Sequence, residues 1–452
     1  MTAASLPPLG YGVATSSYQI EGAVDADGRG PSIWDTFCTV PGAIADGTDG
    51  RTACASYDRL DEDLELLSRL GVSAYRFSVA WPRVQPTGSE AVEPRGLDYY
   101  ERLVDGLLAR GIRPFPTLYH WDLPQPLEDA GGWPVRATAE RFADYCGVVA
   151  GRLADRVDTW ATMNEPWCSA FLGYAAGVHA PGRREPEAAF AAAHHLLLGH
   201  ALGREAVRSV RADAAVGIVL NLAPVRAESD ADPVAVDVVD AIQNRLWLDP
   251  LRGEGYPTAL TSRSAALTDT GVALTGDLDR IAGSADWLGV NYYTPFRIGP
   301  PRDGGRAVGQ APRAYPYTPP MSFRPRPPLT DMGWEVDPTG LGDVLRMAAA
   351  ALPGRPLRVT ENGAAFPDVA QPGGSVDDED RVAYLRDHLD AVDTARAEGL
   401  PVVDYFAWSL LDNFEWAEGY RKTFGLVTVE PDTLRRVPKK SFGWYADRIA
   451  SS

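Results

Sequence analysis

Residues 357–363, Leu-Arg-Val-Thr-Glu-Asn-Gly, have the pattern of a short buried strand that stops at an acid. The β-branched Val359 and Thr360 favour a strand, and the Asn-Gly pair that follows favours a tight turn. Glu361 is therefore expected where a strand ends and a loop begins. In a parallel α/β sheet ligands bind at that end of the strands, and a carboxylate there must be solvated, paired or used. These residues alone fit a turn or salt-bridging glutamate as well as a functional one.

A second acid has the same setting. In residues 157–167, Val-Asp-Thr-Trp-Ala-Thr-Met-Asn-Glu-Pro-Trp, an apolar and β-branched run again ends in Asn-Glu. Pro166 cannot continue strand pairing, so Glu165 is also expected at the end of a strand. Two carboxylates that project from two strand ends into one cleft are the minimum machinery for cleaving a glycosidic bond.

Composition excludes several classes of partner. The 452 residues carry a formal net charge of −18, which argues against nucleic acid or an anionic membrane because phosphates require a basic face. The segment 1–9 has no basic and apolar leader pattern, and no window is apolar enough for a membrane span, so we expect a cytoplasmic protein. Four cysteines without CxxC spacing predict no disulfide framework: Cys38, Cys54, Cys146 and Cys168.

Short apolar runs alternate with helical patterns along the whole chain, which indicates a parallel α/β fold. The expected strands cover residues 11–17, 73–81, 112–118, 157–165, 216–222, 287–293, 357–361 and 402–410. The expected helices cover residues 57–70, 97–110, 138–153, 187–211, 233–247, 340–352, 380–398 and 441–450. Eight strands, each followed by a helix, predict one domain over residues 1–452, a (β/α)8 TIM barrel with long loops on its C-terminal face.

The segment from Pro295 to Pro328 is rich in Pro, Gly and Arg and has no periodicity. It fits an interdomain linker or a long loop at the rim of the barrel. We favour the loop, because the strands on both sides belong to one repeating pattern.

Three histidines lie in the expected helix 187–211, namely His194, His195 and His200. Their i, i+1, i+6 spacing does not bring three imidazoles to one point, so packing and hydrogen bonding are the better interpretation and no metal is predicted. Arg76 lies inside an expected strand and needs an anionic partner when buried, which the barrel would supply as Glu361.

Polar and aromatic residues gather at the expected strand ends. Carboxamides, an imidazole and carboxylates can bond neighbouring hydroxyls, and indole faces stack on the C–H face of a pyranose. A single Trp is more often a core residue, but joint placement at strand ends favours a pocket for a neutral polyol. The set is Gln19, Arg76, His120, Trp121, Asn164, Glu165, Asn291, Tyr293, Glu361, Trp408, Glu415 and Trp416.

The chain resembles family one glycoside hydrolases, the β-glucosidase family, over essentially its whole length. The matching motifs, in the order of the family, are Tyr-Gln-Ile-Glu-Gly at 18–22, Tyr-His-Trp at 119–121, Thr-Met-Asn-Glu-Pro at 162–166, Asn-Tyr-Tyr at 291–293, Thr-Glu-Asn-Gly at 360–363 and Trp-Ser-Leu-Leu-Asp-Asn-Phe-Glu-Trp at 408–416. Two residues depart from the family pattern: Arg358, where an apolar or aromatic residue is usual, and Leu9, where phenylalanine is usual.

The resemblance implies catalytic roles. Glu361 would be the nucleophile that forms a glycosyl-enzyme, and Glu165 the acid that protonates the leaving oxygen and later the base that activates water. Arg76 and the Tyr293 hydroxyl would favour the charged form of Glu361, and the pKa of Glu165 would be raised beside it. Retention requires the two carboxyl groups to be about 5 to 5.5 Å apart. Asn291 belongs to the same catalytic set.

The resemblance also implies sugar contacts. Gln19 and Glu415 would bind the distal hydroxyls, His120 and Trp416 the 3-hydroxyl, and Asn164 the 2-hydroxyl, with Trp408 under the ring and Trp121 in the same pocket. Trp167, Asn221 and Trp334 would line the leaving-group side, and Phe424 would close the rim. The carboxylate of Glu415 would repel a phosphate dianion, which favours an unphosphorylated sugar.

The predicted function is that of a retaining β-glucosidase that hydrolyses terminal non-reducing β-D-glucosyl residues of short β-glucosides or oligosaccharides. β-Galactosides and β-fucosides are further candidate substrates, and no cofactor is expected. Two alternatives stay open at this point: a transglycosylating member of the family, and a non-catalytic sugar-binding barrel. The second usually lacks one of the two acids, whereas this chain keeps both.

Overall fold

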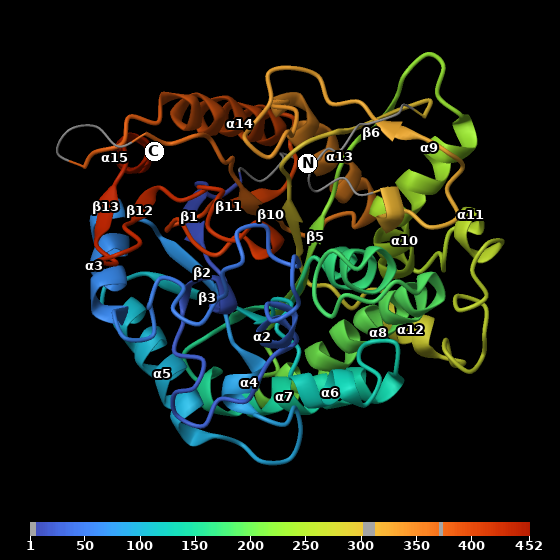
Figure 1. Cartoon of the computed structure of the whole chain (residues 1–452), viewed down its shortest axis with the longest axis horizontal. Helices are drawn as coiled ribbons and strands as arrows, with labels where there is room; N and C mark the ends of the chain where they lie inside the picture. Colours follow the sequence, from blue (N-terminus) through green and yellow to red (C-terminus); the bar gives the residue numbers. More distant parts are fainter. Residues whose placement is uncertain (1–5, 302–311, 370–373) are drawn as a thin grey trace.

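The computed structural model describes residues 6–301, 312–369 and 374–452, and its centre is a closed barrel of eight parallel strands (Figure 1). The order around the barrel is β1-β11-β10-β7-β5-β4-β3-β2, so the first strand pairs with the last and closes the sheet. The predicted single-domain TIM barrel is confirmed. The barrel strands are β1 Gly10–Ala14, β2 Ala74–Ser78, β3 Arg113–Tyr119, β4 Thr159–Asn164, β5 Ala215–Asn221, β7 Leu288–Asn291, β10 Leu357–Asn362 and β11 Val402–Trp408.

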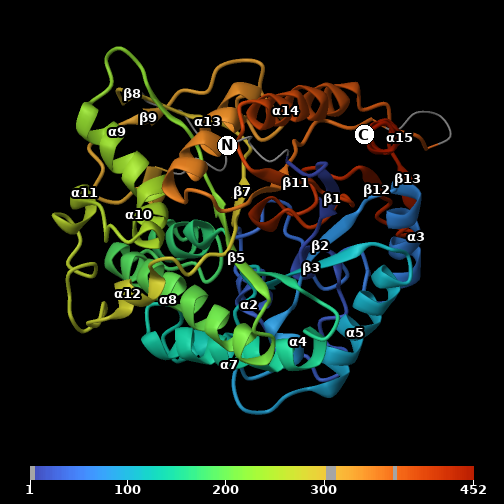
Figure 2. The ribbon, with the colours of Figure 1, turned by 180° about the vertical axis from the view of Figure 1, so that it is seen from behind.

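Helices surround the strands, as the two opposite views show (Figures 1 and 2). Leucine spacing explains α3, whose Leu64, Leu67 and Leu70 are buried and whose C-terminal Gly71 adopts φ of 76°. The longer helices are α3 Leu60–Leu70, α5 Pro94–Leu108, α7 Arg136–Leu153, α8 Pro186–Val210, α9 Pro233–Asp240, α10 Leu246–Arg252, α13 Pro338–Ala351, α14 Glu379–Ala397 and α15 Lys440–Ala450.

Short elements fill the connections. Six are short helices: α1 Ser17–Ile20, α2 Ile33–Phe37, α4 Trp81–Val84, α6 Gln125–Asp129, α11 Thr258–Thr261 and α12 Asp277–Ile281. Two are π-helical, η1 Cys168–Ala176 and η2 Ala241–Arg245, and two are 3-10 turns, η3 Pro312–Ala314 and η4 Trp416–Glu418.

Two apolar layers hold the barrel. The larger lies between the sheet and the helices, and the smaller fills the barrel interior with Phe115, Trp287 and Phe406, whose rings pack 5.2 Å apart in two edge-to-face or tilted pairs. Arg358 points into this interior, where its guanidinium lies over the rings of Phe115 and Trp287 and pairs with Asp404. The departure from the family pattern at this position is therefore accommodated by an ion pair below the aromatic layer.

Several predicted boundaries are wrong. The first strand ends at Ala14, and Ser17–Ile20 form the helical turn α1 because that segment folds over the end of the barrel. The helix predicted for 233–247 is three consecutive segments that reach Arg252, with the π-helical turn η2 in the middle. Strand β10 continues through Asn362. Glu361 is therefore the second-last residue of the strand, and it pairs with Asn291 of β7.

The expected rim loop from Pro295 to Pro328 is wrong in part. Strand β8 (Phe296–Gly299) pairs with β6 (Val225–Ala227) and with β9 (Ser322–Phe323) in a small sheet beside the barrel. Residues 302–311 of this segment lie outside the described residues. A second small sheet joins β12 (Val427–Val429) to β13 (Arg436–Pro438).

The remaining sequence predictions concern thiols, histidines and membranes. All four cysteines are free. The three histidines of α8 hydrogen-bond to protein groups, His194 to Tyr256 and Asp277, His195 to the Trp133 carbonyl and His200 to Thr162, which agrees with the packing interpretation. In the described parts of the chain, no helix has the length and apolar character needed to cross a bilayer.

Candidate active site

Glu361 is the centre of the site at the C-terminal end of the barrel. Its Oε1 accepts a hydrogen bond from Nη1 of Arg76 over 2.6 Å, and its Oε2 accepts one from the Tyr293 hydroxyl over 2.7 Å. Both members of the ion pair are almost fully buried, with 1% of the Arg76 side chain and 4% of the Glu361 side chain exposed. The predicted pairing of a strand arginine with this acid is confirmed. Two donors, one to each oxygen, fix the orientation of this buried carboxyl group.

Glu165 follows β4 directly and adopts a left-handed φ of 44°. Asn291 donates to its Oε1 over 2.8 Å, and the Cys168 thiol donates to its Oε2 over 3.2 Å. Burial raises the pKa of Glu165 well above its usual range, and the nearby charge of Glu361 raises it further. The sequence predicts this direction from the charge of Glu361 alone, whereas desolvation is the larger cause. Glu165 is therefore held as the protonated acid of the pair.

Asn164 joins the two acids. Its Oδ1 accepts hydrogen bonds from Nη2 of Arg76 over 2.7 Å and from Nδ2 of Asn291 over 3.0 Å. Arg76 also donates to Glu361, and Asn291 also donates to Glu165. The carboxamide of Asn164 therefore fixes the two halves of the site relative to each other. Its Nδ2 lies 3.1 Å from Nε2 of His120, and burial lowers the pKa of His120 well below its usual value, so this imidazole is neutral.

Gln19 and Glu415 lie together at another part of the site. Nε2 of Gln19 contacts Oε2 of Glu415 over 3.4 Å, and it also donates to Oδ1 of Asn413 and to the Phe414 carbonyl, each over 3.0 Å. Burial raises the pKa of Glu415 to about 8, with further contributions from the two other glutamates of the site. The predicted grouping of Gln19 with Glu415 is thus present.

One cavity of about 1080 Å³ connects these groups. Glu165, Glu361 and Glu415 all line it, and this volume exceeds what a single hexose requires, so it has room for a leaving group as well. The other predicted residues that line it are His120, Trp121, Asn291, Tyr293, Trp334, Trp408, Trp416 and Phe424, together with Trp167 and Asn221 from the expected leaving-group side. The remaining predicted residues, Gln19, Arg76 and Asn164, are fully buried and bond directly to residues that line the cavity.

Aromatic side chains form much of the cavity wall. The rings of Trp408 and His120 lie nearly parallel with centroids 6.1 Å apart, and Trp416 packs against Trp121 at 4.6 Å. Tyr293 packs against Trp334 at 5.4 Å, beside Phe424. Trp121 and Trp416, like Glu165, have positive φ, a backbone conformation that is uncommon outside glycine and that gathers at functional sites.

Sequence reasoning missed several residues of this cavity. Cys168 contacts Glu165 directly, and its only sequence signal is its position three residues after the acid. His179 and Met332 also line the cavity, and nothing in their local sequence distinguishes them from ordinary loop residues. Residues 40–45 and 176–184 complete the wall from two loops for which no function was predicted.

A closed parallel barrel that presents two buried glutamates at its C-terminal end, one paired with arginine and the other held protonated, defines the class of barrel glycosidases. The model of glycosyl hydrolase family 1 matches residues 8–452. The chain therefore belongs to glycosyl hydrolase family 1, whose members are retaining glycosidases.

Characterised relatives cover almost the whole chain. A bifunctional β-D-glucosidase/β-D-fucosidase from Bifidobacterium breve is 47% identical, over 97% of this chain and 97% of that protein. A β-glucosidase from Agrobacterium sp. is 44% identical, over 96% of this chain and 93% of that protein.

Solved structures agree with the barrel. A psychrophilic β-glucosidase from Micrococcus antarcticus has a TM-score of 0.93 at 44% identity, covering 98% of this chain and 97% of that one. A β-glucosidase from Thermotoga maritima in complex with deoxynojirimycin has a TM-score of 0.90 at 40% identity, covering 99% of both chains.

Proposed function

We propose that the chain is a β-glucosidase that removes terminal non-reducing β-D-glucosyl residues from short β-glucosides, with retention of configuration. The relatives named above, which are β-glucosidases over nearly the full length of the chain, support this substrate class. The bifunctional relative supports β-fucosides as second substrates. Small glycosides and short oligosaccharides such as cellobiose fit a cavity of this size.

Glu361 acts as the nucleophile in this proposal. A carboxylate oxygen of Glu361 attacks the anomeric carbon, and the bond from that carbon to the leaving oxygen breaks, which produces a covalent glycosyl-enzyme. Arg76 and the Tyr293 hydroxyl hold Glu361 in a fixed orientation before the attack, because each donates to a different oxygen of the carboxylate.

Glu165 acts first as acid and then as base. Its raised pKa keeps the proton that the leaving oxygen needs in the first step. Once Glu361 is esterified its negative charge is gone, and Glu165, now deprotonated, no longer faces that charge. In the second step Glu165 takes a proton from water, whose oxygen attacks the anomeric carbon and releases Glu361. Asn291 holds the Glu165 carboxyl in place in both steps.

The other residues recognise the sugar. Gln19 and Glu415 bind the distal hydroxyls, His120 and Trp416 the 3-hydroxyl and Asn164 the 2-hydroxyl. Trp408 supports the pyranose ring, with Trp121 beside it in the same wall. Trp334, Trp167 and Asn221 face the leaving group, and Phe424 closes the rim. The position of Glu165, Glu361 and Glu415 on one aromatic cavity is what supports this assignment.

The observation that carries the proposal is the unequal environment of the two acids: one is fixed by an arginine and a phenol, and the other is buried and bonded to a carboxamide. Environments that push two carboxyl groups toward opposite protonation states assign the acid and the nucleophile.

The test follows the anomer released from an aryl β-glucoside by NMR. We expect the β-anomer of glucose first, and initial release of the α-anomer would overturn the retaining mechanism. In Glu361→Ala we expect turnover to fall by at least about 10⁴-fold because the covalent route is lost, while the thermal unfolding midpoint shows that the variant is folded. Activity near that of the wild type would remove Glu361 as nucleophile.

A further inference from the structure

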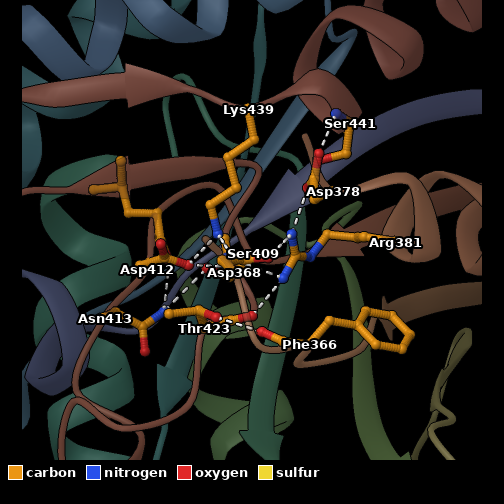
Figure 3. A network of polar contacts seen from close by, with 12 residues as sticks. Phe366, Asp368, Asp378, Arg381, Ser409, Asp412, Asn413, Thr423, Lys439 and Ser441 are labelled. Carbon is orange, nitrogen blue, oxygen red and sulfur yellow. Dashed lines mark hydrogen bonds and ion pairs between the residues drawn. The ribbon is translucent and has the colours of Figure 1, made fainter. Parts of the chain in front are cut away.

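A network of buried ion pairs lies among the connections that follow β10 and β11, and Figure 3 shows it from close by. Two cations, Arg381 and Lys439, bridge three aspartates, Asp368, Asp378 and Asp412. The three aspartate side chains come from the connection after β10, from the residue before α14 and from the connection after β11. The network therefore ties segments that are far apart in the sequence.

Lys439 is the bridge between the two connections. Its Nζ lies 2.5 Å from Oδ2 of Asp368 and 2.7 Å from Oδ1 of Asp412, and its side chain is fully buried. Burial raises the pKa of Asp412, with the positive charge of Lys439 as the largest opposing effect. Removing the ammonium would leave a buried carboxylate without its cation, which is one of the strongest local perturbations in a protein interior.

Asp412 connects this network to the sugar pocket. Its Oδ1 also accepts a hydrogen bond from the backbone N–H of Gly425 over 2.8 Å, which closes the segment 412–425 on itself. Glu415, Trp416 and Phe424 lie within this closed segment and line the cavity.

Arg381 holds the same segment near its other end. Its Nη2 donates to the Thr423 carbonyl over 2.6 Å, and the Thr423 hydroxyl donates to the Phe366 carbonyl over 2.9 Å. Thr423 directly precedes Phe424, so both ends of the segment 412–425 are fixed to buried charges.

The two catalytic glutamates have a different support. The side chains that hydrogen-bond to Glu165 and Glu361 are Arg76, Asn291, Tyr293 and Cys168, and none of these bonds to the network. Loss of the network should thus act on recognition of the sugar more than on the position of the reacting carboxyl groups.

We propose that Lys439 is a positioning residue for sugar recognition: by joining Asp368 to Asp412, its ammonium holds the segment 412–425, and with it Glu415, against the distal hydroxyls of the substrate. This inference rests on the proposed function, because Glu415 is assigned to those hydroxyls there. Lys439 is assigned no contact with the substrate, because its ammonium is engaged by the carboxylates of Asp368 and Asp412.

The test compares an aryl β-D-glucoside with the matching aryl β-D-xyloside, which is the same sugar without its C6 hydroxymethyl group. In Lys439→Met we expect kcat/KM to fall at least about 10-fold for the glucoside, as for loss of one hydrogen bond to the sugar, and by less than about 3-fold for the xyloside. The loss should appear mainly in KM. If kcat/KM falls by the same factor for both substrates, the ratio of the two kcat/KM values is unchanged and the proposal is overturned.

The neighbouring Lys440 supplies a matched control. It is half exposed and pairs with Asp377 and Glu379 at the surface. Lys440→Met should therefore leave unchanged the ratio of kcat/KM for the glucoside to kcat/KM for the xyloside. If the ratio changes equally in Lys440→Met, the effect does not come from the buried bridge and the proposal fails.

A second variant tests the proposal in case the Lys439→Met protein does not fold. Asp412→Asn keeps the size of the side chain and an acceptor for Gly425 but removes the charge that faces Lys439, and it should lower the same ratio. An unchanged ratio in folded Asp412→Asn refutes the bridge. Failure of the wild-type protein to hydrolyse either substrate would instead refute the proposed function.

Discussion

Replacing Cys168 with alanine removes the thiol that donates to Oε2 of Glu165 over 3.2 Å. Burial raises the pKa of the Cys168 thiol well above its usual range, so the thiol keeps its proton and acts as a donor throughout the working pH range. A hydrogen bond to the charged form of an acid lowers the pKa of that acid, so its loss must raise the pKa of Glu165.

The size of this effect follows from the weakness of a thiol as donor. The hydrogen bond from the thiol stabilises the charged form of Glu165 by about 0.7 kcal/mol, and its loss corresponds to a rise of roughly 0.5 in the pKa of Glu165. In the proposed mechanism, Glu165 must be protonated to act as the acid in the first step. The alkaline limb of kcat/KM for a glucoside with a poor leaving group should therefore move to higher pH by roughly 0.5 in Cys168→Ala.

The assay is a pH profile of kcat/KM, which reports groups of the free enzyme. Cys146→Ala is the matched control, because Cys146 is also a buried free thiol but lies in α7 and does not line the cavity. Cys168→Ser keeps a donor to Glu165, so its alkaline limb should not move to higher pH as it does in Cys168→Ala. A limb that stays in place or moves to lower pH in Cys168→Ala would refute the reasoning.

Two further predictions concern the partners of Glu361. Tyr293→Phe keeps the ring against Trp334 but removes the hydroxyl, and kcat/KM for an aryl glucoside should fall roughly 10- to 100-fold with little change in KM; unaltered kinetics would contradict a role for the hydroxyl. Arg76→Met leaves a buried carboxylate unpaired and should cost about 3 to 5 kcal/mol in urea unfolding, but clearly less in a Glu361→Gln background where that charge is absent. The same loss in both backgrounds would show that the ion pair is not its cause.

The sequence predicts most of the barrel because each strand is marked by local chemistry. The apolar run before Glu165 and the one before Glu361 both stop at a turn or proline signal, and the structure places both acids on the same cavity. The contact between Arg76 and Glu361 is predictable for a related reason. A guanidinium inside an apolar strand must find a carboxylate, and the barrel topology offers one.

The features that the sequence does not predict depend on distant neighbours. Strands β8 and β9 are only four and two residues long, too short to produce an alternating pattern, so their segment resembles a loop. Lys439 and Lys440 are adjacent and chemically identical, yet one is fully buried and the other half exposed. Which of them is buried is decided by where Asp368 and Asp412 lie in the fold.

The closure of the barrel ties the first residues of the chain to the last. Strand β1 pairs with β11, the Tyr445 hydroxyl of α15 donates to the Gly12 carbonyl over 2.9 Å, and Lys439 lies only a few residues before Tyr445. During synthesis on the ribosome, one edge of β1 therefore stays unpaired until nearly the whole polypeptide has been translated. Until the barrel closes, that edge exposes unpaired N–H and C=O groups to which another chain could pair.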